Sequence, residues 1–549
     1  MSYLDTPRLH FVGTFNADPS TINNTPQNYG YNPASANPIS LAPSWNPYGS
    51  NIFTINATVT SFVDKDGNLH LSGDPDPLIG ASFGSATEGT PPKLVDLDTE
   101  QQSVTRLYGL NLQLTLRGGN APSLQGLWDN SGTLANLWFS KVPALAGSDN
   151  GAGGAFQSVL QRIQWDQLTG SPLLQQLQNV AENGLSVRLS VWGYDAATTD
   201  STFRTGIIAG TVGPQFDGEP LHLAPRLLIP TSGSQLNCAV AKVNSAGTVV
   251  TLDLGNSIPA NATPQGTAGS PIDLGTMNLV LLGDTPGALG AIDYQGQQFL
   301  DTAGVVPLPI TPQQAGNPFG IIIDDTLALQ ESNPYIDVDG YSVYMNPRGT
   351  VAPEMPGGTA SVNVWAFNLG MPAPGVEVPL SLVPLPSGFV PPGSAAVNTP
   401  ATALTFPRSV TTLDNGVAAL SLTAGDPGAN ARPNIAGQLY FIGGPWASPL
   451  TTNAAAPLTV KVFSSELAGG DELTWAAVQP ILYRFYYMYG FMASIVDLSS
   501  YADVQENSKA ILQVLTTDFN DGGYMPVTRE MAAAERNLIV AWIDAGCPA

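Results

Sequence analysis

The sequence is poor in charge and in the side chains that most often carry chemistry. Charged residues make up 11% of 549 positions, with three histidines and two cysteines, Cys238 and Cys547. So few cysteines cannot form a disulfide framework or a thiolate metal site unaided. Acidic residues number 43 against 19 basic ones, and the net charge of −24 repels nucleic-acid phosphates and anionic lipid headgroups. We therefore expect no nucleic-acid partner.

Long apolar runs are missing as well. No run reaches the roughly 18 residues that a membrane-spanning helix needs. The first residues also lack the basic and apolar segments of a signal peptide. We therefore expect a cytoplasmic protein without a membrane partner. Export by a route that leaves no N-terminal signal is the alternative.

Glycine and proline, in contrast, are abundant. The chain has 57 Gly and 47 Pro, and 43% of its residues are hydrophobic, which is typical of turn-rich β domains and not of disorder. Alternating apolar and polar residues over 53–57, 110–114 and 185–191 predict strands with one buried face. Further strands are expected at 205–212, 236–242, 247–254 and 278–283.

Two stretches of this first region show helical spacing. Apolar residues at 156, 159, 160 and 163 predict a helix over 155–165. Ser171 can cap a second helix that Pro172 begins and Gly184 ends. We expect both apolar stripes to pack in the core. Residues 1–330 are thus predicted to form a β-rich body with a few helices.

Residues 331–465 are expected to form an immunoglobulin-like β-sandwich. The stretch ASVNVWAFN alternates, and GVEVPLSLVPL follows it after a short turn. Asp414-Asn415-Gly416 marks a turn between two further strand runs. This region resembles the bacterial Ig-like modules in which a GVxVxL strand precedes a DNGVAxLxL strand. That resemblance implies a fold and no chemistry.

Residues 466–549 change to helical periodicity. We expect a helix carrying Val478, Ile481, Leu482 and Phe485, with Pro480 near its first turn. Ser500 can cap a helix that runs to Leu515, and Thr528 can cap a last helix that Gly546 ends. The predicted fold class is therefore mainly β and multidomain, with a C-terminal α-helical module.

The helical region resembles a c-type cytochrome domain. The segments VQPILYRFYYMYG, VDLSSY, MPVTREM and RNLIVAWIDAGCP follow the order of that family. Haem attachment needs two thiols and an axial imidazole, and residues 485–490, which occupy the matching stretch, contain neither. Met525 stands where the second axial ligand is expected. The resemblance implies a cytochrome c-like module without haem, so no cofactor is expected.

The opening stretch DTPRLHFVGTFNADPSTIN resembles the start of the iminophenyl-pyruvate dimer synthases of violacein biosynthesis and their chromopyrrolate-synthase relatives. LSVWGYDAATTDSTFRTGIIAGTVGP, LNCAVAKVNSAGTVVTLDLGNSIP and the helical tail follow in the order of that family. In the family a ferritin-like iron domain follows and oxidatively couples two imines derived from an aromatic amino acid. This sequence ends at Ala549, before such a domain would begin.

The resemblance therefore implies a stand-alone accessory or scaffold protein in secondary-metabolite biosynthesis. Its expected partner is a separately encoded ferritin-like or other oxidase. The isolated chain is not expected to be an enzyme, although it can be part of an oxidoreductase complex. A binding or assembly protein for glycans or protein complexes is the alternative from a different class.

The opening stretch also holds a candidate binding or structural corner. Arg8 to Val12 alternate as a strand, with Leu9 and Phe11 on one face. Arg8 can pair with Asp5 or Asp18, and His10 can donate to a neighbouring carbonyl. This pattern favours a corner that pins the N-terminus to the first sheet over a ligand site. The corner comprises Asp5, Arg8, His10, Asp18, Asn23 and Asn24.

A third hypothesis is a metal-dependent enzyme that uses the few histidines. Glu219 and His222 have the Glu-x-x-His spacing of helical iron ligands, but Pro220 between them opposes a helix. His10, His70 and His222 can in principle join in a three-histidine site. Isolated strand histidines are usually structural, so no metal site is predicted. His70, Glu219 and His222 remain the weak candidates.

Overall fold

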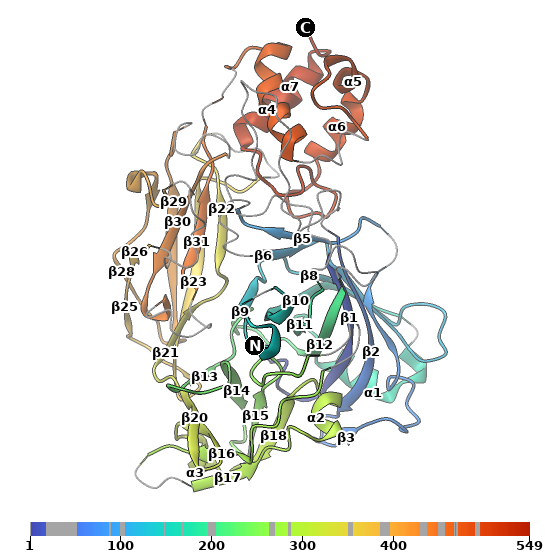
Figure 1. Cartoon of the computed structure of the whole chain (residues 1–549), viewed down its shortest axis with the longest axis vertical. Coiled ribbons are helices and arrows are strands. Elements are labelled where there is room, and N and C mark those ends of the chain that lie inside the picture. The colour runs from blue at the N-terminus through green and yellow to red at the C-terminus, as the bar shows by residue number, and fades with distance from the viewer. Residues whose placement is uncertain are drawn as a thin grey trace.

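The computed structural model describes most of the chain. The described residues are 2–17, 52–86, 89–98, 105–147, 149–166, 168–195, 205–262, 269–283, 287–349, 355–384, 396–428, 436–447, 456–465, 467, 470–488 and 495–549. The fold is mainly β, with several sheets and few helices, which confirms the predicted fold class. Figure 1 shows the helices between Trp475 and Asp544 gathered at one end, with the sheets and a few short helices filling the rest of the molecule. No helix in these ranges is long and apolar enough to cross a membrane.

The first unit is a closed antiparallel barrel. Its strands are ordered β1-β12-β11-β10-β8-β7-β4-β2, and β1 pairs with β2 to close the ring. Leu9, Phe11 and Phe15 of β1 point into its core, where the buried residues of α1 (Pro172–Val180) join them. The strand bounds are β1 Arg8–Ala17, β2 Phe53–Val63, β4 Ser82–Ser85, β7 Asn111–Thr115, β8 Leu124–Trp128, β10 Gly153–Trp165, β11 Leu185–Trp192 and β12 Thr205–Pro214; β3 Leu69–His70 and β9 Leu134–Trp138 add to this sheet.

The predicted helix over 155–165 is wrong, because these residues belong to β10. Residues 153–160 are buried on both faces of the strand, with Phe156 in the barrel core and Val159 in a separate cluster outside it. A strand buried on both faces loses its alternation and can imitate helical spacing. The helix starting at Pro172 is confirmed, and the Ser171 hydroxyl accepts the Leu174 N–H at its N-terminus.

The second unit is an antiparallel sheet of eight strands with its own apolar core. Its order is β17-β16-β19-β20-β13-β14-β15-β18, and the predicted strands at 236–242, 247–254 and 278–283 correspond to β14, β15 and β16. The strand bounds are β13 Arg226–Pro230, β14 Ala239–Val243, β15 Val249–Asp253, β16 Met277–Leu281, β17 Gly287–Ala291, β18 Val305–Pro309, β19 Phe319–Ile323 and β20 Thr326–Glu331, with short helices α2 Gln297–Asp301 and α3 Pro312–Ala315.

The third unit is a sandwich of two main sheets. One sheet is β21-β23-β29-β27 with β24 beside β23, and the other is β22-β31-β30-β26, in which β22 and β31 run parallel. The strand bounds are β21 Tyr335–Val338, β22 Ser342–Met345, β23 Thr359–Asn368, β24 Met371–Pro372, β25 Glu377–Pro379, β26 Ser381–Leu382, β27 Leu404–Thr405, β28 Ser409–Thr411, β29 Val417–Ala424, β30 Gln438–Gly443 and β31 Leu458–Val462; β25 pairs with β28.

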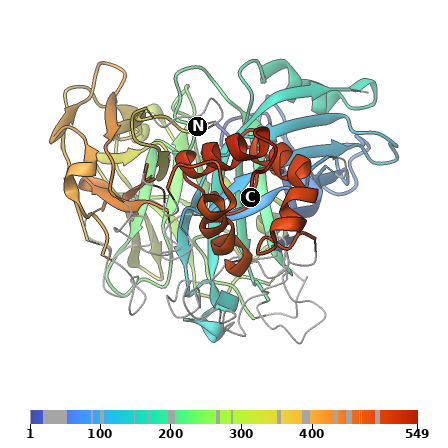
Figure 2. The same cartoon turned by 90° about the horizontal axis from the view of Figure 1, so that it is seen from above.

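The sandwich core extends into two other parts of the chain. The same apolar cluster contains Tyr108 of the hairpin β5 (Lys93–Asp96) and β6 (Thr105–Tyr108), and Phe519 and Tyr524 from the segment before the last helix. Seen from above in Figure 2, the C-terminal helices lie over the region where the sandwich and the first barrel adjoin. The hairpin, the sandwich and the segment before the last helix thus share one apolar core.

The helical unit consists of α4 (Trp475–Met488), α5 (Tyr501–Glu506), α6 (Ser508–Leu515) and α7 (Ala533–Asp544) around its own core. Pro480 lies inside α4 and not in its first turn, because buried Ala477, Val478 and Ile481 hold the helix on both sides of it. Ser500 caps α5 as predicted, but Asn507 separates α5 from α6.

Thr528 does not cap the last helix, which is a further correction. The chain stays non-helical from Thr528 to Ala532, with Glu530 fully buried. Helix α7 begins only at Ala533, and Glu535 accepts the N–H of Ala532 at 3.0 Å. Met525 packs against the sandwich core, whereas Phe485 lies in the helical core.

Candidate functional site

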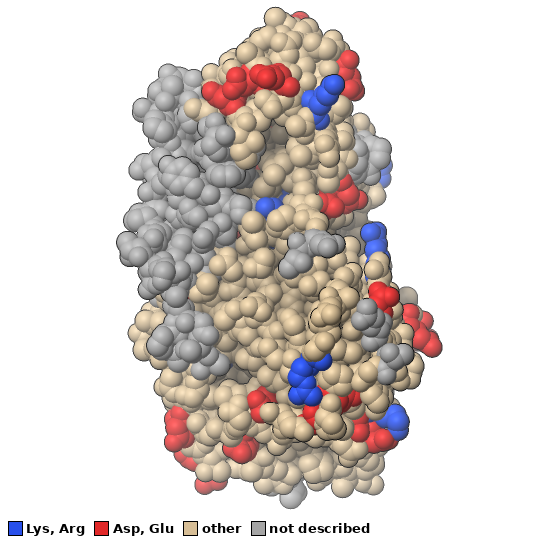
Figure 3. Space-filling model, turned by 90° about the vertical axis from the view of Figure 1, so that its right-hand side faces the viewer, with Lys and Arg blue, Asp and Glu red and all other residues tan. Residues whose placement is uncertain are grey.

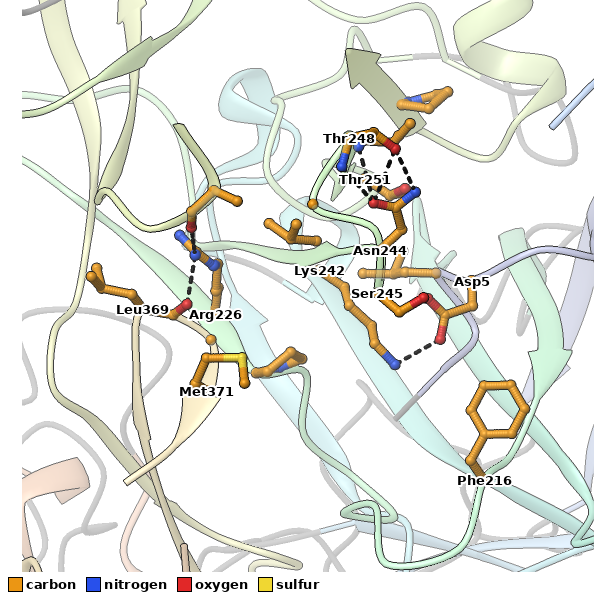
Figure 4. Close-up of a pocket in the computed structure, with 18 of the residues that line it drawn as sticks. Asp5, Phe216, Arg226, Lys242, Asn244, Ser245, Thr248, Thr251, Leu369 and Met371 are labelled. Atoms are coloured by element: carbon orange, nitrogen blue, oxygen red, sulfur yellow. Dashed lines mark hydrogen bonds and ion pairs between the residues drawn. The ribbon is translucent and has the colours of Figure 1, made fainter. Parts of the chain in front are cut away.

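A cleft of about 1590 Å³ lies where the first barrel, the second sheet and the sandwich meet. The N-terminal segment around Asp5 forms one wall, together with β14 and the turn that follows it. The loop from Asn368 to Val376 of the sandwich forms another wall. In Figure 4, Asp5 and Lys242 face Arg226 and Leu369 across the cleft.

Lys242 holds the first wall together. Its Nζ donates to Asp5 Oδ2 at 2.7 Å, to Glu219 Oε1 at 2.8 Å and to the Ser2 hydroxyl at 2.8 Å. The Ser2 hydroxyl in turn donates to Glu219. Burial alone would lower the pKa of Lys242, but the two carboxylates outweigh it and raise this pKa above its usual value. The group stays charged at neutral pH and remains partly open to water.

On the opposite wall, Arg226 links the second sheet to the sandwich loop. Its guanidinium pairs with Glu331 at 3.0 Å and donates to the carbonyls of Ala315 and Leu369 at 2.5 Å each. Burial lowers the pKa of Arg226 and raises that of Glu331, although each partner's charge opposes the shift. A Cβ on Gly370, whose φ is +80°, would lie 2.7 Å from Arg226 Nε. Glycine therefore lets the sandwich loop close over the guanidinium.

The predicted corner is only partly assembled as expected. Asp5 and Arg8 both line the cleft, but Asp5 pairs with Lys242, and Arg8 donates to the Leu4 carbonyl at 2.9 Å. Within the described ranges no Asp5–Arg8 ion pair forms. Burial lowers the pKa of Arg8 to about 10, with Asp5 opposing the shift. Asp18, Asn23 and Asn24 lie outside the described residues.

His10 is a structural residue of β1. Its Nδ1 lies 2.8 Å from the Thr211 hydroxyl, so its partner is a side chain on β12 and not the expected carbonyl. The ring is fully buried, and burial, reinforced by the charge of Arg8, holds the pKa of His10 well below its usual value. A neutral imidazole is therefore the form in the folded protein.

The other two histidines occupy separate settings. His70 Nδ1 lies 2.8 Å from Asp74, whereas His222 Nδ1 lies 2.9 Å from Asp339 and its Nε2 lies 3.1 Å from the Ser131 hydroxyl. Glu219 turns to Lys242, away from its sequence neighbour His222. Within the described part of the chain, no three His, Cys, Asp or Glu residues are grouped to hold a metal ion.

Sequence reasoning missed Lys242 and Arg226, the two cations on which the cleft walls depend. Lys242 interrupts the apolar run CAVAKV, and Lys461 interrupts LTVKVF in the same way. A lysine inside an apolar strand must find a charged partner or reach water. In a chain with only 19 basic residues, a lysine inside an apolar strand was the signal that could have pointed to these positions.

Comparisons with known proteins give no family. No family model matches the chain, and neither does any curated protein. Among solved structures, domains 1–6 of the surface layer protein SbsC match with 11% identity and a TM-score of 0.15, covering 76% of this chain and 53% of that one. The S-layer protein rSbsC(31–844) matches with 12% identity and a TM-score of 0.14, covering 77% and 53%. The chain thus spans about half the length of these structures, and scores this low carry no argument about fold or function.

Proposed function

We propose that this chain is a non-catalytic accessory scaffold that binds another protein in the cleft. The observation that carries the proposal is the size of the cleft. Its 1590 Å³ exceeds the range of about 300–1,000 Å³ that is usual for small-molecule sites, and it is bordered by three units of the fold. A polypeptide segment fits such a space better than a single small ligand.

The lining of the cleft agrees with a protein partner. Phe216 and Met371 line it and are 42% and 68% exposed, and aromatic residues and methionine are enriched in protein interfaces. Most residues that line the cleft are uncharged, and the described residues on the face shown in Figure 3 are likewise mostly uncharged, with scattered acidic and basic groups. A cleft lined in this way is suited to a defined docking position more than to general electrostatic attraction.

The family resemblance suggests which partner to look for. It implies a ferritin-like or other oxidase of secondary-metabolite biosynthesis, with this chain helping to shape the substrate pocket of that partner. The proposed setting is the cytoplasm. All three histidines are engaged in hydrogen bonds that position strands or loops, which supports a structural role for the residues that a metal enzyme would need.

The test is affinity purification of the tagged full chain from the cells that make it, with mass spectrometry and metal analysis of the same sample. The cleft variant carries Phe216→Ala and Met371→Ala. Leu413→Ala, at a residue 69% exposed outside the cleft, is the matched control. We expect one stoichiometric partner with the wild type and the control, and binding weaker by about tenfold or more with the cleft variant.

Two results would contradict the proposal. Equal capture by the wild type and the cleft variant would show that the cleft is not the binding site, and the absence of any stable partner would remove the accessory role. Iron that travels with the captured partner supports the oxidase assignment. A partner without iron or another redox centre would overturn that assignment and leave only the scaffold.

A further inference from the structure

A second lysine, Lys461, lies between two carboxylates in the dry interior. Its Nζ is 2.9 Å from Asp98 Oδ2 and 2.5 Å from Glu530 Oε2. The side chains of Lys461 and Asp98 are 0% exposed, and that of Glu530 is 1% exposed. The three residues come from three parts of the chain: Lys461 from β31 of the sandwich, Asp98 from the residues that follow β5, and Glu530 from the segment before α7.

The surroundings of this group are mainly apolar, and Asp96 and Tyr344 are neighbouring polar groups, because Asp98 acts electrostatically on Asp96 and Glu530 acts on Tyr344. Lys461 lies on a strand whose five residues are all buried, between Val460 and Val462, and its Nζ is 5.6 Å from the centre of the Phe463 ring. Hydrogen bonds between β31 and its neighbours β22 and β30 hold the lysine backbone in register. The amine therefore approaches the two carboxyl groups from a rigid position with little freedom to leave.

Such a setting changes the balance between an ion pair and a neutral pair. Removing charges from water is expensive, and mutual attraction does not always repay it. Transfer of a proton from the ammonium to a touching carboxylate gives an amine and a carboxylic acid without net charge. Because the reacting groups are already held in contact, their reaction avoids most of the loss of translational and rotational entropy that two separate molecules would incur.

We propose that Lys461 and Asp98 join spontaneously in an intramolecular isopeptide bond, with Glu530 as the proton-transfer group. Asp98 is assigned as the electrophile because the shorter hydrogen bond, to Glu530, suits proton transfer from the attacking nitrogen. The site is a self-modification site and needs no external substrate. It is independent of the cleft and of the partner proposed above.

The reaction balances without an oxidant or a co-reactant. The Lys461 ammonium gives one proton to Asp98, and the free amine attacks Asp98 Cγ to form the Nζ–Cγ bond. Glu530 takes a second proton from that nitrogen and returns it to the departing hydroxyl, which leaves as water when the Cγ–O bond breaks. One ammonium and one carboxylate become one amide and one water, and Glu530 ends as it began.

The proposed bond would join the β5–β6 hairpin covalently to the sandwich. It joins Asp98, which follows β5 in the hairpin, to β31, the last strand of the sandwich, in contact with Glu530 from the segment before α7. A cross-link between residues this distant in sequence restricts the unfolded chain strongly. Neighbouring contacts, such as Arg106 Nε donating to Ser342 at 2.6 Å, align the hairpin with β22.

The decisive measurement is the mass of the purified, denatured full-length chain. We expect the wild type to be lighter than its sequence mass by one water molecule. Trypsin should fail to cleave after Lys461, and tandem mass spectrometry should show a branched peptide that joins Lys461 to Asp98. Glu530→Gln should keep the full sequence mass or lose water much more slowly.

The matched control is Glu219→Gln, at the lysine group beside the cleft, which should not change the loss of water. A folded wild type with its full sequence mass would overturn the proposal, and so would water loss that maps to a site other than this pair. A branch between Lys461 and Glu530 would reverse the assigned roles and refute the mechanism. If Glu530→Gln does not fold, the wild-type mass and peptide map still decide.

Discussion

The molecule contains two groups made of the same three residue types, and they differ in their access to water. Lys242 with Asp5 and Glu219 has hydrogen bonds of 2.7 and 2.8 Å and side chains that are 17–20% exposed. Lys461 with its own aspartate and glutamate has similar distances of 2.9 and 2.5 Å, but its side chains are at most 1% exposed. Composition and geometry are nearly matched, so burial is the variable.

The comparison indicates that the same contacts contribute differently to stability at the two places. Water screens charges at a partly exposed group, where an ion pair typically contributes up to about 1 kcal/mol. In a dry interior the charges cannot be left unpaired, because a single buried charge costs several kcal/mol. Breaking the group beside the cleft therefore costs less free energy than breaking the inner group.

The largest effect is expected from removing the buried lysine. Lys461→Met leaves the carboxyl groups of Asp98 and Glu530 in the interior without the lysine and also removes the proposed cross-link, so it should lower the free energy of unfolding by at least about 3–5 kcal/mol. Lys242→Met, the matched change, should cost about 1 kcal/mol or less. Denaturant unfolding of both variants checks this. Equal losses would show that burial does not distinguish the groups.

A smaller loss of stability is expected on replacing Arg226. This residue tests whether burial or position in the cleft determines the loss. Arg226 lines the same cleft as Lys242, but its side chain and that of Glu331 are 2% and 1% exposed. Arg226→Gln should therefore cost about 3 kcal/mol, closer to the inner lysine than to its neighbour in the cleft. Denaturant unfolding again gives the measurement. A loss no greater than that of Lys242→Met would mean that position in the cleft, and not burial, decides.

Local sequence patterns predicted much of the fold. Alternation located β2, β7 and β11, and the Ser171-Pro172 pair located α1. The same reasoning failed in β10, where both faces are buried and the alternation disappears. Local patterns could not predict that the barrel closes. A closed barrel depends on pairs of residues far apart in the chain, such as Leu9 and Val212.

The sites were harder to predict for the same reason. Asp5 and Arg8 were selected as a corner and do line the cleft, but the cation that pairs with Asp5 is 237 positions away. Asp98 and Lys461 are separated by 363 positions. Only the fold brings such residues together, and a single sequence shows at most that a lysine in an apolar strand needs a partner.

The smallest effect concerns a third cation between two carboxylates, this time a histidine, the residue type whose ordinary pKa lies near neutrality. His70 lies 2.8 Å from Asp74 and 3.4 Å from Asp64, and the hydrogen bond to Asp74 raises the pKa of His70 above 6.5 despite partial burial. A raised pKa adds stability that is fully present below the unfolded value of 6.5 and is lost as the pH rises through the folded value.

His70→Asn should therefore lower stability more at about pH 5.5 than at about pH 8.5, by less than about 1 kcal/mol because the side chains are partly exposed. Unfolding curves of both proteins at the two pH values measure the difference. His10→Asn is the contrast, because burial keeps His10 neutral and its loss should cost more at the higher pH. A larger loss for His70→Asn at the higher pH would contradict this prediction. It would show that Asp74 and Asp64 do not stabilise the protonated form of His70.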